Sequence, residues 1–419
     1  MPRDAEVIVI GGGAIGICTA YHLWKNGVTV AVLEKNEIGS GCSYGNAGLV
    51  VPSHIIPLAA PGMIAKGLKW MFNPESPFYL KPRIDLDFFS WLWHFHVSSS
   101  PQRCQNSIPI LHELLQASAA LFEEFAHAQK FEFGYEKRGL LMLYKTQQDL
   151  AAERVVAEQA RALGLQVSEL SPDEILALEP NARTLARGAM YYHGDAHLEP
   201  AQFVLGLSHF LSGNGVAIHA HTAVTGLETS GNRVSVVQTS RGAFTAREVV
   251  LAGGAWSPQI LQALRLKLPL QAGKGYSITL PAPPKPLRIP LILHEARVVI
   301  TPLQGKLRFA GTMELAGLDP SINQRRVRAI LAAVPEYLPD LNPITQIESA
   351  EIWSGLRPCT PDGLPYLARF REYPNLIAAT GHAMLGLALA PITGKLVADL
   401  VCGRRPSVAL EALRCERFN

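Results

Sequence analysis

The chain has 419 residues, enough for one large core or two linked cores, and we expect two domains. It is 48% hydrophobic and only 17% charged, with a net charge of +3, so its composition gives no sign of a nucleic-acid-binding surface. The thirteen histidines form no group with metal-ligand spacing, and we predict no metal site.

The cellular context follows from the cysteines and from the apolar segments. Six scattered cysteines without a C-x-x-C pair predict reduced intracellular thiols, with one or two disulfides as the alternative. The first residues, MPRDAEVIVIGGG, run directly into a predicted strand, so we expect no signal peptide. No apolar segment reaches about 18 uninterrupted residues, so we expect no spanning helix. The protein is expected to be cytoplasmic, with peripheral attachment to the inner face of the cell membrane left open.

A nucleotide-binding pattern opens the chain. Residues 7–10 form a β-branched run typical of a strand buried on both faces of a parallel sheet. GGGAIG follows and places Gly11, Gly13 and Gly16 in G-x-G-x-x-G spacing, before a predicted helix and a second apolar strand that ends at Glu34. This strand–turn–helix–strand context, with an acidic residue about 20 residues on, predicts a dinucleotide site. Backbone amides would bind the pyrophosphate, and Glu34 would accept the ribose hydroxyls and disfavour NADP.

The motif alone leaves NAD and FAD open. The next stretch, GSGCSYGNAG at residues 39–48, is a long loop that carries hydrogen-bonding side chains such as Ser43 and Asn46. Such a loop suits a long dinucleotide lying extended across the sheet, which favours FAD. The cofactor contacts predicted in these first fifty residues are Gly11, Gly13, Ala14, Ile15, Gly16, Glu34, Lys35, Gly41, Cys42, Ser43, Asn46, Ala47 and Gly48.

Residues 62–97 concentrate aromatic side chains, in GMIAKGLKWMF and DLDFFSWLWHFHV. On a helix these residues would cover nearly every side, so one buried stripe cannot hide them all. Packing within the protein or against a partner subunit is one interpretation. A patch on a membrane surface, helped by Lys66 and Lys69 beside Trp70, is the other.

The middle of the chain alternates helical and strand patterns. A helix is predicted from residue 147 to about 163, a short helix within 169–180, and a strand at the start of 188–200. Residues 216–258 predict further strands, the last ending in LAGGAW, where small residues let a backbone pass close to something flat or charged. Residues 268–317 alternate as in antiparallel sheet, and NQRRVRAILAAVPEYL is helical. There is no second G-x-G-x-x-G, which disfavours the two-nucleotide design of pyridine-nucleotide disulfide reductases.

The last hundred residues predict a turn that faces the cofactor. Residues 375–403 read as a strand, a turn at 381–386 and a long helix with Pro391 near its start. Such a turn directs backbone amides and a helix end at one point, which suits a ring that becomes anionic on reduction. Upstream, WSGLRPCTPDG sets Arg357 between apolar neighbours and a turn, with no obvious acidic partner in the stretch.

Six motifs occur in one order from end to end: the glycine-rich start, SYGNAG, LAGGAW, KGYSIT, WSGLRPCTPDG and TGHAMLGLALAPITG. In these motifs the chain resembles the FAD-dependent D-amino-acid oxidase superfamily, most closely its D-amino-acid dehydrogenase small-subunit branch, with glycine oxidases and D-hydroxyproline dehydrogenases as near relatives. The resemblance implies an α/β fold, with a Rossmann-like FAD-binding domain and a mostly antiparallel-sheet α+β substrate domain. The implied FAD-binding domain is discontinuous, at residues 1–50, 196–258 and 352–419, and the substrate domain comprises residues 51–195 and 259–351.

The resemblance also implies site residues. Arg357 occupies the place of the family's G-[FL]-R-P arginine, whose planar fork binds the substrate carboxylate. Tyr276 is implied as a second carboxylate contact or a shield, and His54 as a residue of the pocket. Met384, apolar and on the flavin-facing turn, favours a larger apolar substrate side chain over glycine. The remaining implied FAD contacts are Val224, Gly253, Trp256, Gly381, His382, Ala383, Met384, Leu385 and Gly386.

The implied reaction is oxidation of a D-amino acid by hydride transfer from Cα to flavin N5, followed by hydrolysis to a 2-oxo acid and ammonia. Cys359 sits differently from the flavin-linking cysteine of sarcosine oxidases, which implies non-covalent FAD. The electron acceptor is expected to be a quinone or another non-oxygen carrier. Three alternatives stay open: an oxygen-using oxidase, an enzyme for glycine, L- or N-methyl amino acids, and a non-catalytic flavoprotein subunit of a larger complex.

Overall fold

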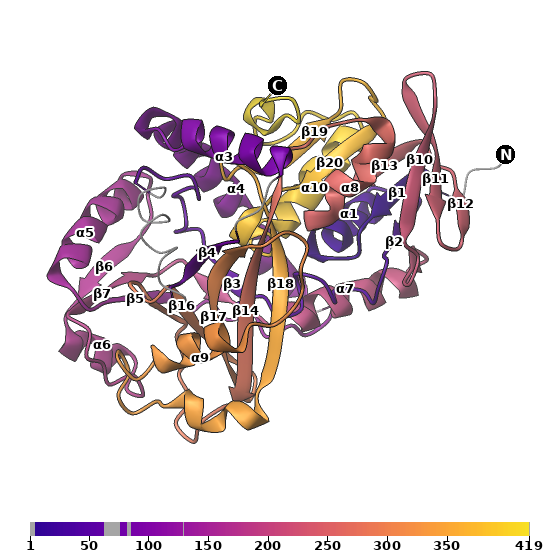
Figure 1. Ribbon diagram of the computed structural model, residues 1–419. Coiled ribbons are helices and arrows are strands. Elements are labelled where there is room, and N and C mark those ends of the chain that lie inside the picture. The colour runs from indigo at the N-terminus through magenta and orange to yellow at the C-terminus, as the bar shows by residue number, and fades with distance from the viewer. Residues whose placement is uncertain (1–4, 63–75, 82–84, 129, 419) are drawn as a thin grey trace.

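The computed structural model describes residues 5–62, 76–81, 85–128 and 130–418. Two large sheets organise these residues, a six-stranded sheet that is mostly parallel and a nine-stranded sheet that is mostly antiparallel (Figure 1). The predicted α/β fold, with a Rossmann-like part and a mostly antiparallel part, is confirmed.

The six-stranded sheet runs in the order β19-β20-β13-β1-β2-β9. Its described pairings are all parallel except β19 with β20. The strands are β1 (Val7–Ile10), β2 (Val30–Leu33), β9 (Ala217–His219), β13 (Glu248–Leu251), β19 (Tyr366–Arg369) and β20 (Leu376–Thr380).

Both faces of this sheet are covered, which explains the β-branched run of β1. Successive side chains of a strand point to opposite faces. Val7 and Val9 accordingly pack in the core with helices, whereas Ile8 and Ile10 pack in a second core with the small sheet of β10, β11 and β12. The helices packed on the first face are α1 (Ala14–Lys25), α4 (Pro101–Ala128), α7 (Pro200–Gly213) and α10 (Ala390–Val401). The small sheet consists of β10 (Val224–Ser230), β11 (Arg233–Thr239) and β12 (Gly242–Phe244).

The nine-stranded sheet runs in the order β18-β14-β17-β16-β15-β5-β7-β6, and β4 pairs with β17. In the described chain its pairings are antiparallel except β5 with β15 and β4 with β17. The strands are β4 (Phe78–Leu80), β5 (Leu140–Tyr144), β6 (Val167–Leu170), β7 (Gly188–Tyr192), β14 (Gln271–Pro281), β15 (Leu291–Leu293), β16 (Val298–Leu303), β17 (Lys306–Leu315) and β18 (Glu351–Cys359).

The remaining elements surround these sheets. Side chains of α6 and α9 join the apolar core of the nine-stranded sheet. The other helices are α3 (Leu86–Ser98), α5 (Gln147–Ala162), α6 (Pro172–Leu178), α8 (Ser257–Leu261) and α9 (Gln324–Ala332). Short 3-10 turns lie at Gly254–Trp256, Gln262–Leu264, Pro343–Ser349, Ala383–Leu385 and Glu411–Leu413. A two-stranded ribbon pairs β3 (Leu49–Val50) with β8 (Ala196–His197).

The aromatic segment is divided between core and surface. On α3, Phe88 and Trp91 are buried, and the Trp91 indole donates to the Cys359 carbonyl at 2.9 Å. Phe89 and Trp93 on the same helix are exposed. Packing within the protein therefore accounts for one side of α3 only. Lys66, Lys69 and Trp70 lie outside the described residues.

The strand pairing and the core packing place β18 and α4 differently from the proposed domain division. Residues 352–359 of β18 were assigned to the FAD-binding part, yet they pair with β14 in the nine-stranded sheet. In addition, α4 was assigned to the substrate domain and packs in the same core as α1 and α10. The division into domains remains a proposal.

Candidate active site

The first glycine turn is closed by the neighbouring strand. Gly11 has a φ of +112°, and a Cβ placed on it would lie 2.4 Å from the Ala252 carbonyl oxygen. Only glycine fits this position, because the conformation strains other residues and the backbone of β13 leaves no room. A Cβ on Gly16 would lie 1.8 Å from the Gly11 carbonyl oxygen, so Gly16 serves the close packing of α1 on the turn.

The amino-terminal end of α1 presents a positive region to the cavity. Its N-cap, Gly13, offers no side-chain cap, and the first turn contains no acidic residue. The Ala14 amide donates to Ser43 Oγ at 3.0 Å, which brings the polar loop of residues 39–48 to the helix end. Free amides and the helix dipole together favour an anion such as a pyrophosphate.

The Glu34 carboxylate is held at the end of β2. Its Oε2 accepts from the Gly12 amide at 2.8 Å and its Oε1 from the Asn36 amide at 2.9 Å. Each oxygen keeps a further lone pair for a ribose hydroxyl. Beside it, the Lys35 ammonium lies 3.2 Å from the centre of the Trp256 ring. Burial lowers the pKa of Lys35, and the charge of Glu34 acts in the opposite direction.

The loop of residues 39–48 is fixed by side chains from the nine-stranded sheet. Arg308, on β17 and 5% exposed, donates through Nη1 to the Asn46 carbonyl at 2.7 Å and to the Tyr44 carbonyl at 3.3 Å. Thr301 Oγ1 donates to the Ala47 carbonyl at 2.7 Å. The loop is therefore positioned by residues more than 250 places away in sequence.

Arg357 lines the cavity near the place where β18 meets the turn at residues 381–386, through the bridge between Cys359 and His382. Its Nη1 donates to the Thr312 carbonyl at 2.7 Å, and its guanidinium lies against Gly275 of β14. A Cβ on Gly275 would lie 2.3 Å from both terminal nitrogens, so the glycine of KGYSIT makes room for the arginine. No described acidic side chain forms an ion pair with Arg357, which leaves its charge available to an anion.

The turn at residues 381–386 contributes to the same part of the cavity. Gly381 and Ala383 have φ angles of +82° and +47°. His382 is buried, its Nε2 lies 2.9 Å from Thr393 Oγ1, and burial lowers its pKa to about 3, so the imidazole is neutral. Met384 is 51% exposed and lines the cavity.

These elements enclose a cavity of about 500 Å³. It brings together most of the predicted site residues: Gly11, Gly13, Ala14, Ile15, Glu34, Lys35, Gly41, Cys42, Ser43, Asn46, Val224, Gly253, Trp256, Arg357, His382, Ala383, Met384 and Gly386. Within the described chain, the predicted residues that do not line it are Gly16, Ala47, Gly48, His54, Tyr276, Gly381 and Leu385.

The structure does not bring Tyr276 and His54 to the cavity. Gly275 faces Arg357, so its neighbour Tyr276 points to the other face of the strand, where its hydroxyl donates to Glu314 Oε2 at 2.8 Å. His54 is packed against Ser53, whose Oγ lies 3.2 Å from its Nδ1, and burial lowers the pKa of His54 to about 4. Neither residue lines the cavity, and their roles toward the substrate remain a prediction.

Several lining residues were missed from the sequence, among them Thr222, Ala223 and Thr225. They follow β9, which lies beside β2, and the Thr222 amide donates to the Glu34 carbonyl at 2.7 Å. Ligands of open α/β sheets bind beyond the carboxyl ends of the strands. Recognition of β9 as a strand of the parallel sheet could have identified these residues.

The fold and the cavity define a dinucleotide-binding protein, and Arg357 lines the same cavity as the glycine-rich turn. The chain belongs to the DAO family of FAD dependent oxidoreductases, whose model matches residues 6–400. The resemblance inferred from the six motifs is thus confirmed.

Relatives and solved structures agree with this membership. A D-amino acid dehydrogenase of Granulibacter bethesdensis is 30% identical over 419 residues, and the match covers 99% of both chains. One from Cereibacter sphaeroides is 31% identical over 420 residues, covering 99% of this chain and 95% of the relative. The crystal structure of glycine oxidase from Geobacillus kaustophilus superposes with a TM-score of 0.80 at 26% identity, covering 99% of each chain.

The cofactor is FAD, as the family requires, and the residues present fit it. A pyrophosphate suits the glycine turn at Gly11 and the amino-terminal end of α1, which has no acidic residue. The ribose of a dinucleotide suits the Glu34 carboxylate, which the Gly12 amide holds in place. Pro358, His382, Ala383, Met384 and Gly386 line the remaining part of the cavity, where the isoalloxazine would lie. Among the described residues, no helix is both long and apolar enough to cross a membrane.

Proposed function

We propose that this enzyme oxidatively deaminates D-amino acids to 2-oxo acids and ammonia and passes the electrons to a quinone or another non-oxygen acceptor. The observation that carries the proposal is Arg357, a partly buried guanidinium without an acidic partner among the described residues, in the same cavity as the nucleotide motif. The names of the full-length relatives support the same substrate class.

Arg357 would bind the substrate carboxylate. Its planar fork makes two parallel hydrogen bonds to a carboxylate, which lysine cannot reproduce. The Thr312 carbonyl already holds one amino group of the fork, and Gly275 supports its flat face, so the orientation is set before substrate arrives. A fixed carboxylate fixes the position of Cα, and positioning of this kind supplies a large share of catalysis.

The reaction needs no base on carbon. When bound, without a covalent link, FAD accepts the hydride that leaves Cα. The substrate ammonium must first lose a proton to water, so that the amine is neutral when the hydride leaves. Water then hydrolyses the resulting imino acid to a 2-oxo acid and ammonia. The described titratable side chains that line the cavity near Arg357 are Cys42, whose pKa burial raises to about 11, and His382, which is neutral. Neither carries a charge that competes with the substrate carboxylate.

Met384 supports a substrate with an apolar side chain. It lines the cavity and is half exposed, so its thioether is available for apolar contact. We expect D-alanine, D-proline or larger apolar D-amino acids to be oxidised faster than glycine. Replacement of Met384 by lysine should reduce that preference, as measured by kcat/KM for D-proline relative to glycine.

The choice of acceptor is connected with α3. Leu86, Phe89 and Trp93 are 85%, 52% and 65% exposed, and they recur at helical spacing on one side of the helix. Such a face suits peripheral contact with a membrane that contains the quinone. Flotation with liposomes would retain the enzyme if this holds, and an enzyme that stays wholly unbound would contradict it.

The decisive experiment is anaerobic mixing of the yellow holoenzyme with a panel of D-, L- and N-methyl amino acids. Bleaching of the flavin by D-amino acids supports the proposal, and bleaching by L- or N-methyl substrates alone overturns it. A flavin that stays yellow with every substrate would indicate a structural cofactor. Peroxide formation compared with dye reduction, on the same substrate, separates an oxidase from a dehydrogenase.

Arg357→Ala tests the role of the arginine. Loss of the charged anchor should reduce kcat/KM about 1,000-fold, while FAD remains bound because the nucleotide contacts are untouched. Arg241→Ala, at an exposed position, serves as the control and should behave as the parent enzyme. Unchanged turnover in Arg357→Ala would end the assignment.

A further inference from the structure

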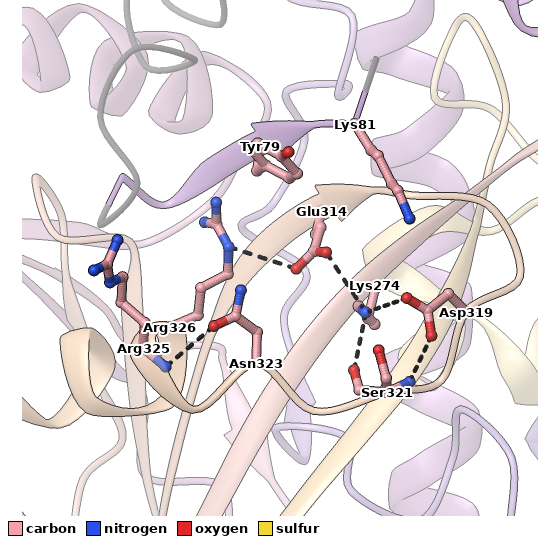
Figure 2. A pocket seen from close by; sticks show the side chains of 9 residues that line it. All are labelled: Tyr79, Lys81, Lys274, Glu314, Asp319, Ser321, Asn323, Arg325 and Arg326. Carbon is pink, nitrogen blue, oxygen red and sulfur yellow. Dashed lines mark hydrogen bonds and ion pairs between the residues drawn. The ribbon is translucent and has the colours of Figure 1, made fainter. Parts of the chain in front are cut away.

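A second pocket lies on the face of β14 that points away from Arg357. Gly273 faces Met313 and Cys359, and Gly275 faces the Arg357 guanidinium. The residue between them, Lys274, points to the other side of the strand. The pocket has a volume of about 500 Å³ (Figure 2). It is lined by Tyr79, Lys81, Lys274, Glu314, Asp319, Ser321, Asn323, Arg325 and Arg326.

The floor of this pocket is a buried ionic network. Lys274 is 1% exposed; its ammonium donates to the Ser321 carbonyl at 2.9 Å and lies 3.5 Å from both Glu314 Oε1 and Asp319 Oδ2. Arg326, 3% exposed, lies 3.5 Å from Glu314 Oε2 through its Nε. Both carboxylates are therefore compensated by these two buried cations, as the dashed lines in Figure 2 show.

The rim adds two cations that the network does not compensate. Lys81 and Arg325 are exposed, and neither side chain has an ion pair or hydrogen bond with a described residue. The lining thus contains four basic and two acidic side chains, an excess of two positive charges. The amino-terminal end of α9, with Asn323 as its N-cap and no acidic residue in its first turn, strengthens the positive character.

The arrangement of the excess charges indicates the kind of anion. In Figure 2, Lys81 extends over Lys274 at one side of the pocket, and Arg325 lies at the other side beyond Asn323. Cations on two sides of one pocket suit a ligand that carries a negative group at each end, and a small dicarboxylate is such a ligand. Tyr79, Ser321 and Asn323 supply hydroxyl and amide groups between them.

We propose that this pocket, which we call the back pocket, binds a small dicarboxylate. One carboxylate pairs with Lys81 and the other with Arg325, above the buried Lys274–Glu314–Arg326 network. The site is separate from the cavity of Arg357, because adjacent residues of β14 face the two.

Isothermal titration calorimetry of the holoenzyme tests the back pocket at low ionic strength, where exposed charges are least screened. Succinate and glutarate are the probes, with butyrate and inorganic phosphate as comparison ligands. We expect saturable binding of a dicarboxylate and affinity about tenfold weaker for butyrate, which lacks the second charge. No saturable binding of either dicarboxylate overturns the proposal, as does phosphate binding at least as tightly.

Single substitutions show whether the dicarboxylate that calorimetry detects is bound in the back pocket. Lys81→Ala and Arg325→Ala should each weaken dicarboxylate binding about fivefold, because each removes one exposed charge pair. Lys306→Ala, an exposed lysine at the start of β17 outside the pocket, should leave binding unchanged. Arg357→Ala should also leave it unchanged. Loss of binding in Arg357→Ala, with Lys81→Ala unaffected, would place the dicarboxylate in the flavin cavity and overturn the proposal.

Discussion

The two ends of the flavin cavity are built from different material. The nucleotide end consists mainly of backbone and glycine from residues 7–48, a single continuous segment. The end around Arg357 consists of side chains and carbonyls brought together from β14, β17 and β18 and from the turn at 381–386. A site formed by local backbone geometry can be recognised from the spacing of residues in the sequence. A site assembled from distant strands depends on how those strands pair and in which register, and the sequence does not state this directly. Substitutions at the nucleotide end should therefore reduce FAD affinity, whereas substitutions at the end around Arg357 should reduce turnover and leave FAD bound.

Gly11→Ala should give the largest effect and should be confined to the nucleotide end. The new Cβ would meet the Ala252 carbonyl oxygen at 2.4 Å, in a conformation that L-residues rarely adopt. We expect FAD affinity to fall more than about 1,000-fold, because the turn must open to relieve the contact. Fluorescence titration of the apoprotein with FAD measures the affinity.

Gly27→Ala is the matched control for Gly11→Ala. Gly27 also has a positive φ, +75°, but a Cβ there meets nothing within 4 Å. Its substitution should cost about 1 kcal/mol of stability and leave FAD affinity unchanged. Equal losses of FAD in both variants would show that φ strain, rather than the approach of β13, makes Gly11 essential.

Gly275→Ala should damage only the end around Arg357. The Cβ would lie 2.3 Å from the terminal nitrogens of Arg357, and the flexible side chain would move rather than the strand. We therefore expect kcat/KM to fall about 100-fold with FAD retained and the fold intact. Gly226→Ala, on β10, is the control, because its nearest neighbour would be 3.9 Å away. A variant that binds and turns over substrate normally would separate Gly275 from the placement of Arg357.

The nucleotide end could be predicted because each of its determinants lies close in sequence to the next. The buried run of β1, the glycine spacing, the helix and Glu34 all occur within thirty residues, and the structure has each in its predicted element. The threonines after β9 were missed since the pairing of β9 with β2 joins segments far apart in the chain.

The other end depended on resemblance, and strand geometry decides which of its predicted residues line the cavity. Gly275 and Tyr276 are neighbours in β14 and face opposite sides of the sheet. Gly275 lies against Arg357, whereas the Tyr276 hydroxyl donates to Glu314. Alternation along KGYSIT shows that Gly275 and Tyr276 face opposite sides of the strand, but not which side faces the cavity. The sequence alone therefore could not place Tyr276. Arg308 was not considered, since its acceptors, the carbonyls of residues 44 and 46, become its neighbours only when β17 packs on the loop.

Arg308→Met should affect the nucleotide end, because Arg308 of β17 fixes the loop of residues 39–48. The substitution keeps an apolar stem and removes the hydrogen bonds to Asn46, Tyr44 and Thr279. We expect FAD affinity to weaken about 30-fold, close to 2 kcal/mol, since buried carbonyls lose a charged donor. Arg308→Lys, which can reach one carbonyl, should recover part of the affinity. If Arg308→Met binds FAD as the parent enzyme does, the loop of residues 39–48 holds its position without the sheet.

His382 gives the smallest effect and concerns the charge of the end around Arg357. Burial lowers its pKa to about 3 from an ordinary value near 6.5, so the unfolded chain binds a proton more readily between these values. The unfolding free energy should therefore fall as the pH decreases from 6.5 toward 3, by about 1 kcal/mol between pH 7.5 and 5.5. Urea unfolding of His382→Gln should lack this part of the pH dependence, while His209→Gln, exposed on α7, should retain it. Parallel curves for His382→Gln and the parent enzyme would mean that folding leaves the pKa of His382 unchanged, and the buried imidazole would then take up a proton below about pH 6.5 in the folded enzyme.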